Sequence, residues 1–272
     1  MPQKVIITGF WIALLMAFHT PLWAIQDTDT PSAESLINAG DFAAAIDAGR
    51  VENTAQGHSI AAKAELILAR FYADEDARNI HIESAITEGH LALTLAADNR
   101  EEVANALFQL GAAWGLRARY QQNVSYARRA EDYLVQALEN NPNNAAVLAG
   151  LGGWHGEAVA RAGGLMARLI LGARRSEMER YFDAAIALDP ENMNILSGQA
   201  TTHLRLGKAA DLELARRRLN QLLAMTPVTG LDKIIQTYAQ TLLSALDTGD
   251  RQKLKDIMET YRAADIEVSD DQ

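Results

Sequence analysis

The sequence predicts an all-α protein, a stack of about 11–12 helices that pack in pairs as in helical-repeat proteins. The first observation is a phrase in which a large residue, a small residue and an aromatic ring stand at positions i, i+4 and i+7, on one face of a helix. It recurs three times, as Leu107/Gly111/Trp114, Leu148/Gly152/His155 and Leu196/Ala200/His203. The small residue would let the next helix approach closely, so each unit would bury its apolar face against its neighbours.

Two further observations support the same fold class. The second and third phrases each follow a segment that stops at a proline, Pro142 or Pro190, as expected where a helix must end. The composition is rich in alanine, the best helix former, and the chain holds only six prolines in 272 residues. Segments that alternate β-branched and polar residues are scarce, so no strand is expected.

The helices expected from apolar periodicity and turn residues follow one another with short breaks. In the first half of the chain they span 33–39, 42–49, 57–72, 80–97, 101–119 and 124–139. In the second half they span 145–172, 176–188, 193–206, 209–225, 230–246 and 251–264. The breaks carry turn and capping residues: Gly40-Asp41, the polar segment 74–78, Asp98-Asn99 as an N-cap, the Asn-rich run around Pro142, and Gly207.

Segment 145–172 is unusually long for a repeat helix. Its apolar stripe, at helical spacing, consists of Leu148, Leu151, Ala158, Ala162, Leu165, Met166, Leu169 and Ile170. The pair Gly163-Gly164 interrupts the segment and is expected to kink or break it. A stripe this long needs cover, so it either packs in the core or mediates self-association.

The domain organisation is predicted to be simple. Residues 1–24 carry Lys4, a 14-residue mostly apolar run and a small residue at Ala24, which is typical of a cleaved signal peptide. A retained membrane anchor is the alternative, but the run is short for a helix that spans a bilayer. Residues 25–264 would form one helical-repeat domain, and 265–272 an acidic, disordered tail. No cysteine follows the apolar run, so no lipid attachment site is present.

Charge and composition exclude several classes of function. The net charge is −10, and loss of Lys4 with the signal makes it −11, so phosphate neutralisation on nucleic acid is not expected. The chain has no cysteine, which excludes thiolate metal sites and cysteine nucleophiles. Neither a His-Glu-x-x-His motif nor a Gly-x-Ser-x-Gly motif occurs. We therefore expect a protein that is not an enzyme and uses no metal or cofactor.

The residues from Leu107 to Pro227 resemble the tetratricopeptide repeat (TPR) family. The three phrases are similar to its first helix, and two segments are similar to its second helix: Ala130, Leu134, Ala137, Leu138 with Pro142, and Phe182, Ala185, Ile186 with Pro190. Residues 25–100 carry little of this pattern. The resemblance implies a TPR-like α-solenoid with a concave surface for a partner.

The spacing departs from that family in one place. Pro142 and Pro190 are 48 residues apart, whereas the family repeats after about 34 residues. The excess falls within 155–178 and gives one extended helix pair. Such a pair looks like the TPR-like subunit associated with TRAP-type solute transporters of bacteria, which is periplasmic. It is also similar to the regulator-of-microtubule-dynamics family, through Trp154-His155 and Val159-Ala160. The export signal favours the transporter-associated relative.

The candidate binding residues come from the repeat rings and from nearby arginines. Trp114, His155 and His203 occupy the aromatic position of the phrase, where they either pack as structural rings or line the groove. Arg161, Arg168 and Arg175 recur every seven residues beside the apolar stripe, and arginine suits an acidic surface or a carboxylate. Solvated helix faces are the alternative reading of these charges. We expect Trp114, His155, His203, Arg161 and Arg168 to bind a partner.

The function expected from the sequence is that of an exported, periplasmic interaction scaffold. Its partner would be another exported protein, such as a solute-binding protein, and a homo-oligomer is the alternative. The second hypothesis is an accessory component of a TRAP-type system that handles a small ligand in an apolar cavity between the helix pairs. Nucleic acid is not expected as a partner.

Overall fold

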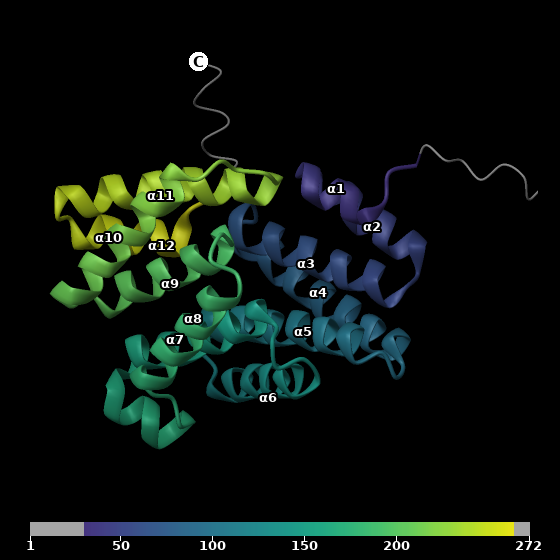
Figure 1. The fold of residues 1–272 in the computed structure, drawn as a ribbon, viewed down its shortest axis with the longest axis horizontal. Helices are drawn as coiled ribbons and strands as arrows, with labels where there is room; N and C mark the ends of the chain where they lie inside the picture. Colours follow the sequence, from purple (N-terminus) through teal and green to yellow (C-terminus); the bar gives the residue numbers. More distant parts are fainter. Residues whose placement is uncertain (1–29, 264–272) are drawn as a thin grey trace, which may run out of the picture. The chain divides into compact units, whose positions relative to one another are not determined.

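The computed structural model describes residues 30–263 as a chain of helices (Figure 1). Across these residues it contains twelve helices and no strand, which confirms the predicted all-α, solenoid-like class. The first six are α1 (Ala33–Ala39), α2 (Phe42–Glu52), α3 (Ala55–Phe71), α4 (Glu75–Ala96), α5 (Arg100–Gln121) and α6 (Val124–Asn140). The last six are α7 (Ala145–Leu171), α8 (Arg175–Leu188), α9 (Met193–Leu206), α10 (Ala209–Ala224), α11 (Gly230–Thr248) and α12 (Arg251–Thr260). The expected signal peptide and the acidic tail lie outside the described residues.

The helix ends follow the local capping chemistry. Asn99 caps α5 by accepting hydrogen bonds from the backbone N–H groups of Glu101 and Glu102, as expected. Gly207 ends α9 in the left-handed conformation, with φ of 68°, where a residue without Cβ is favoured. One prediction was wrong: segment 74–78 is not a turn. Asp74 accepts from the N–H of Ala77, so its side chain starts α4 there.

The small residues of the repeated phrase allow the close helix contacts that were predicted. A Cβ added to Gly111 of α5 would lie 2.8 Å from the Leu134 side chain of α6. A Cβ on Gly152 of α7 would lie 2.9 Å from the ring of Phe182 in α8. In the third copy Ala200 is fully buried. In each copy the small residue therefore lies against a neighbouring element, as expected for stacked helix pairs.

Contacts between the first and last helices were not foreseen. One core cluster joins apolar residues of α1 to α3 with residues of α9 to α12. The carbonyl of Phe71 accepts a hydrogen bond from the N–H of Ala263 at 2.6 Å. Gly40 and Gly230 approach so closely that a Cβ on Gly230 would lie 2.3 Å from the Gly40 Cα. The two ends of the array (α1 and α11 in Figure 1) therefore pack together instead of remaining free.

Helix α7 has the predicted interruption. Gly163 has φ 74° and ψ 155°, which is outside the helical region, so the axis kinks there. Before the kink, Leu148 and Leu151 are buried; after it, Leu165, Met166, Leu169 and Ile170 are 71%, 48%, 70% and 40% exposed. The stripe is thus two surfaces, one in the core and one facing outward. We call the four exposed residues the outer stripe.

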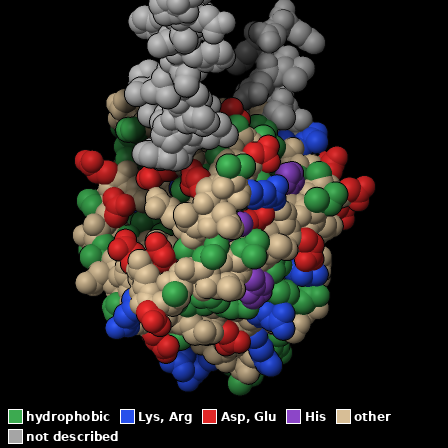
Figure 2. Space-filling model, turned by 90° about the vertical axis from the view of Figure 1, so that its right-hand side faces the viewer, with side chains coloured by type: hydrophobic (Ala, Val, Ile, Leu, Met, Phe, Trp, Pro, Cys, Tyr) green, Lys and Arg blue, Asp and Glu red, His purple; other side chains and the backbone are tan. Residues whose placement is uncertain are grey.

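None of the described helices has the length and apolar character needed to span a membrane. On the face shown in Figure 2, acidic, basic and apolar side chains are interspersed. A mixed surface of this kind does not produce a strong field of one sign.

Candidate functional site

The three repeat rings lie inside the protein, not on a groove surface. Trp114 and His155 are buried, and His203 is only 2% exposed. Trp114 packs on Tyr126, with the guanidinium groups of Arg117 and Arg129 over its ring. The structure therefore places these residues as packed structural rings, the alternative given above. The expectation that they line the groove was wrong, because the aromatic position faces the neighbouring helix of each pair.

Each buried histidine is held by defined contacts. The ring of His155 stacks on Tyr181 with centroids 5.6 Å apart, and its Nδ1 accepts from the Arg174 N–H at 3.3 Å. Burial lowers the pKa of His155, which suits a neutral ring that accepts this bond. His203 Nδ1 lies 2.8 Å from Asp211, and Arg175 donates two bonds to the same carboxylate at 2.5 and 3.0 Å. These contacts fix helices to one another.

The arginines at seven-residue spacing do not form a strip. Arg161 and Arg168 lie on opposite sides of the kink at Gly163, and Arg175 belongs to α8. Arg175 is engaged by Asp211, while Arg168 is exposed. Arg161 alone among them lines a cavity. The predicted basic strip does not form, because residues at a regular spacing share a face only while the helix is continuous.

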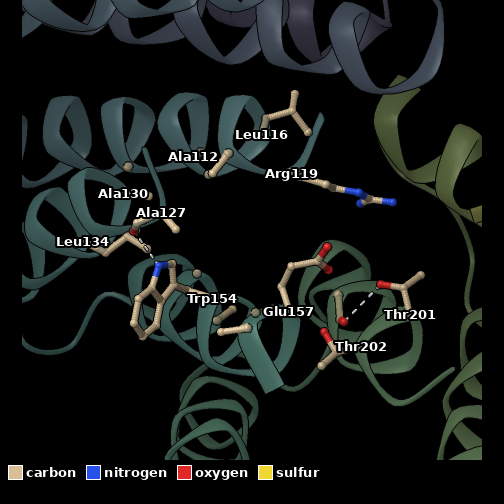
Figure 3. Close-up of a pocket in the computed structure, with 18 of the residues that line it drawn as sticks. Ala112, Leu116, Arg119, Ala127, Ala130, Leu134, Trp154, Glu157, Thr201 and Thr202 are labelled. Atoms are coloured by element: carbon tan, nitrogen blue, oxygen red, sulfur yellow. Dashed lines mark hydrogen bonds between the residues drawn. The ribbon is translucent and has the colours of Figure 1, made fainter. Parts of the chain in front are cut away.

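The cavity that Arg161 lines has a volume of about 680 Å³ and lies between α5, α6, α7 and α9 (Figure 3). Ala112 and Leu116 of α5 lie on one side of it, and Trp154 of α7 and Thr201 of α9 on the other. Trp154 is fixed by donating its indole N–H to the Ala127 carbonyl at 2.7 Å. The wall is mainly Ala, Gly and Leu, so this part of the cavity is apolar.

One end of the cavity carries charge. Glu157 of α7 accepts from Arg161 Nε at 2.6 Å and lies 3.3 Å from Arg205 Nη1 of α9. Arg119, at the end of α5, lies near Glu157 and also lines the cavity (Figure 3). A second cavity of about 780 Å³, which reaches α10 to α12, shares these four residues. We call Arg119, Glu157, Arg161 and Arg205 the arginine cluster.

Electrostatics in the arginine cluster are unbalanced. Burial raises the pKa of the Glu157 carboxyl, but Arg205, Arg119 and Arg161 more than offset this and hold that pKa below its usual range. Burial, together with the charges of Arg205 and Arg70, lowers the pKa of Arg119 to about 10. Guanidinium groups are normally protonated far above that value. The cluster therefore holds more positive charge than its own carboxylate neutralises.

Most cavity residues were not predicted, because the repeated phrase marks the packed rings and not the positions beside them. The residues two positions before each ring, Ala112, Gly153 and Thr201, all line the cavity. So do the residues two positions after it, which are Leu116, Glu157 and Arg205. Two steps of about 100° turn a side chain to the opposite face of a helix. The phrase thus contained the information: its ring marks the packed face, and the flanking positions mark the cavity.

No protein-family model and no curated protein matches this chain. The resemblance to TPR proteins, and to the subunit of TRAP-type transporters, therefore remains a sequence-based prediction. Within residues 30–263, no group of three or more His, Asp, Glu or Cys side chains could hold a metal ion. The site is best described by its geometry, an apolar cavity with a positively charged end.

Proposed function

We propose that this protein is not an enzyme and that it binds a small molecule in the cavity between α5, α6, α7 and α9. The observation that carries the proposal is the cavity itself, about 680 Å³ in volume. Ligand pockets are typically about 300–1,000 Å³ and mostly apolar, with a few polar groups that fix orientation.

Small residues keep the cavity open. Gly153 lies in the middle of α7 and lines the space, and a Cβ added there would meet nothing within 4 Å. A glycine in a helix interior costs about 1 kcal/mol relative to alanine, so it is unfavourable for the fold alone. Ala112 and Ala149 line the same space with side chains that leave most of it free.

The wider setting of this activity is a further part of the proposal. Export to the periplasm follows from the expected signal peptide, and a role beside a TRAP-type transporter follows from the resemblance of the extended helix pair. In that setting the protein would receive the ligand from, or pass it to, a solute-binding protein. A helical array with an apolar cavity supports this role better than a scaffold that binds through exposed repeat rings, since the rings are buried.

The test uses phenylnaphthylamine, an uncharged dye that fluoresces in apolar sites, as the probe. Replacing Gly153→Phe puts a ring into the open space, and we expect dye affinity to fall at least about tenfold. The matched control is Gly164→Phe, on the same helix but outside the cavity, where an added Cβ also meets nothing within 4 Å. Equal binding by the Gly153→Phe variant and the wild type would show that the dye site lies elsewhere.

A protein-interaction scaffold is the second candidate, favoured by the outer stripe. Four large apolar side chains grouped on one exposed helix turn suggest a contact surface. Replacing Leu165 and Leu169 by Ser should lower self-association or partner capture, measured by sedimentation and pull-down. Val51→Ser is the control, because Val51 is equally exposed but lies outside this group. Unchanged association in the double variant would remove this candidate.

A further inference from the structure

Some guanidinium donors of the arginine cluster have no acceptor among the described residues. Three guanidinium groups, those of Arg119, Arg161 and Arg205, surround the single carboxylate of Glu157. Arg161 is satisfied by its short bond to Glu157 at 2.6 Å. Arg205 reaches the same carboxylate with Nη1, but its Nη2 is buried and has no hydrogen-bond partner within residues 30–263. A buried donor of this kind is costly to leave unpaired.

Arg119 also has few polar partners for a guanidinium group. Its Nη2 donates to the Met258 carbonyl at 2.8 Å, and it forms no ion pair with any carboxylate of the described residues. Arg70, which acts on Arg119 through its charge, also has a buried nitrogen, Nη1, without a partner. Burial is the main cause of the lowered pKa of Arg119, and repulsion from the nearby charges of Arg205 and Arg70 adds to it. An anion placed here would pair with Arg119 and with the free nitrogen of Arg205, and it would relieve the repulsion.

The position of the cluster connects this charge to the cavity. Arg119, Glu157, Arg161 and Arg205 line both the apolar cavity and the second cavity that reaches α10 to α12. A molecule in the apolar space would therefore have its end against the guanidinium groups. Arginine presents a planar set of donors that matches carboxylate and similar oxyanions.

We propose that the ligand is an organic anion whose apolar body fills the cavity and whose oxyanion group is bound by Arg119 and Arg205. This inference depends on the proposed function, because it assigns the ligand class to the same cavity. Glu157 then has two roles: it orients Arg161 and Arg205, and it competes with the ligand for them. Neutral molecules of the same shape would bind more weakly, since they leave the guanidinium donors unpaired.

The test compares two dyes with the same ring system on the purified protein. Anilinonaphthalene sulfonate carries a sulfonate, and phenylnaphthylamine has no charge. We expect the sulfonate dye to bind roughly tenfold or more tightly, as for a hydrogen-bonded charge. In Arg119→Gln and Arg205→Gln this preference should fall to near one, while phenylnaphthylamine affinity is retained. Arg217→Gln, an exposed arginine that lines neither cavity, is the control and should keep the preference.

A variant that is expected to bind more tightly controls for loss of binding through misfolding. Glu157→Gln removes the competing carboxylate, so the sulfonate dye should bind several-fold more tightly. Misfolding cannot produce a gain that is specific to the charged dye. Equal affinities for both dyes in the wild type, or a preference that survives both arginine substitutions, would overturn the anion assignment. If neither dye binds, or if Gly153→Phe weakens neither, the proposed function itself fails.

Discussion

Two groups of charged residues in this molecule use the same side-chain types in different ways. Between α2, α3 and α4, the buried carboxylates Glu65 and Glu88 each accept several short bonds. Arg50 donates to both, His58 lies 2.6 Å from Glu88, and His81 lies 2.5 Å from Glu65. We call these five residues the N-terminal network. In the arginine cluster, by contrast, Arg161 and Arg205 share the one carboxylate of Glu157, Arg119 pairs with no carboxylate, and a buried nitrogen of Arg205 has no partner among the described residues.

The difference distinguishes charges that stabilise the fold from the charges that we propose to bind a ligand. In the N-terminal network the acidic groups have cationic or hydroxyl partners on neighbouring helices, and Ser84 adds a bond to Glu65 at 2.6 Å. Loss of one member would leave a buried charge unpaired. In the arginine cluster, Nη2 of Arg205 is already buried without a hydrogen-bond partner among the described residues. A protein that tolerates such a cost at a cavity usually does so for function.

The largest effect is expected in the N-terminal network. Glu88→Ala would leave His58 and Arg50 without their shared carboxylate, and breaking a buried ion pair costs about 3–5 kcal/mol. Urea unfolding followed by circular dichroism measures the free energy. Glu83→Ala is the control, because Glu83 is 56% exposed where it pairs with Arg117, and solvent-exposed ion pairs contribute about 1 kcal/mol or less. Equal losses in both variants would contradict the structural role of the network.

The second prediction concerns pH and the Asp211 site, which is paired in the same manner as the N-terminal network. Burial raises the pKa of Asp211, but the bonds from Arg175 and His203 hold it below 3.8, its ordinary value. Its contribution to stability is therefore present above pH 3.8 and is lost as pH falls through the lower, folded-state pKa. Asp211→Asn should be less stable than the wild type at neutral pH by about 2 kcal/mol or more.

The pH dependence distinguishes this pairing from simple packing. The difference in unfolding free energy between Asp211→Asn and the wild type should narrow as pH falls below 3.8, because the carboxyl then binds a proton in the unfolded state first, and it should close once pH falls below the lower, folded-state pKa. Unfolding free energies measured from neutral to acid pH test this directly. A gap that stays constant over the whole range would show that the carboxylate charge contributes nothing.

Neighbouring glycines give the third prediction. Gly152 faces α8 and Gly153 faces the cavity. Gly152→Ala should destabilise the fold by about 1–3 kcal/mol, since its Cβ would press on Phe182. Gly153→Ala should be neutral or stabilising by up to about 1 kcal/mol, since the cavity accepts a methyl group and alanine favours helix. Thermal unfolding of both variants measures this; the reverse order would contradict the assignment of the two faces.

The smallest effect on stability is expected for Arg119→Met. The substitution removes a cation that burial and its neighbours disfavour, and it loses one hydrogen bond to Met258. We therefore expect a change of less than about 1 kcal/mol in either direction. Arg50→Met is the matched comparison and should cost clearly more, because two buried glutamates depend on Arg50. Similar losses in both would remove the distinction between the two groups.

Much of the fold was predictable because helix periodicity, caps and prolines are local signals. Phe42, Val124, Ala145, Met193, Ala209, Gly230 and Arg251 were each expected to begin a helix and do so. The kink at Gly163 was also expected. The contact between Gly40 and Gly230 was not predictable, because nothing local links residues so far apart in the sequence.

The candidate site was predicted less well. Of the five residues expected to bind a partner, Arg161 alone lines the cavity; Trp114, His155 and His203 are buried, and Arg168 is exposed beyond the kink. The repeated ring was prominent in the sequence because packing requires it at each copy. The cavity residues two positions away differ from copy to copy, as Leu116, Glu157 and Arg205 do, so they form no repeated pattern. These residues can be assigned to a common helix face only after the packed face is known.

We propose that the cavity selects anions because the guanidinium groups of the arginine cluster outnumber its carboxylate. The most direct measurement is calorimetric titration of three molecules with the same alkyl tail: decanoate, decanol and decyltrimethylammonium. We expect decanoate to bind most tightly and decyltrimethylammonium most weakly. The difference in affinity should shrink as salt screens the charges. Equal affinities for all three, or tighter binding of the cation, would contradict this proposal.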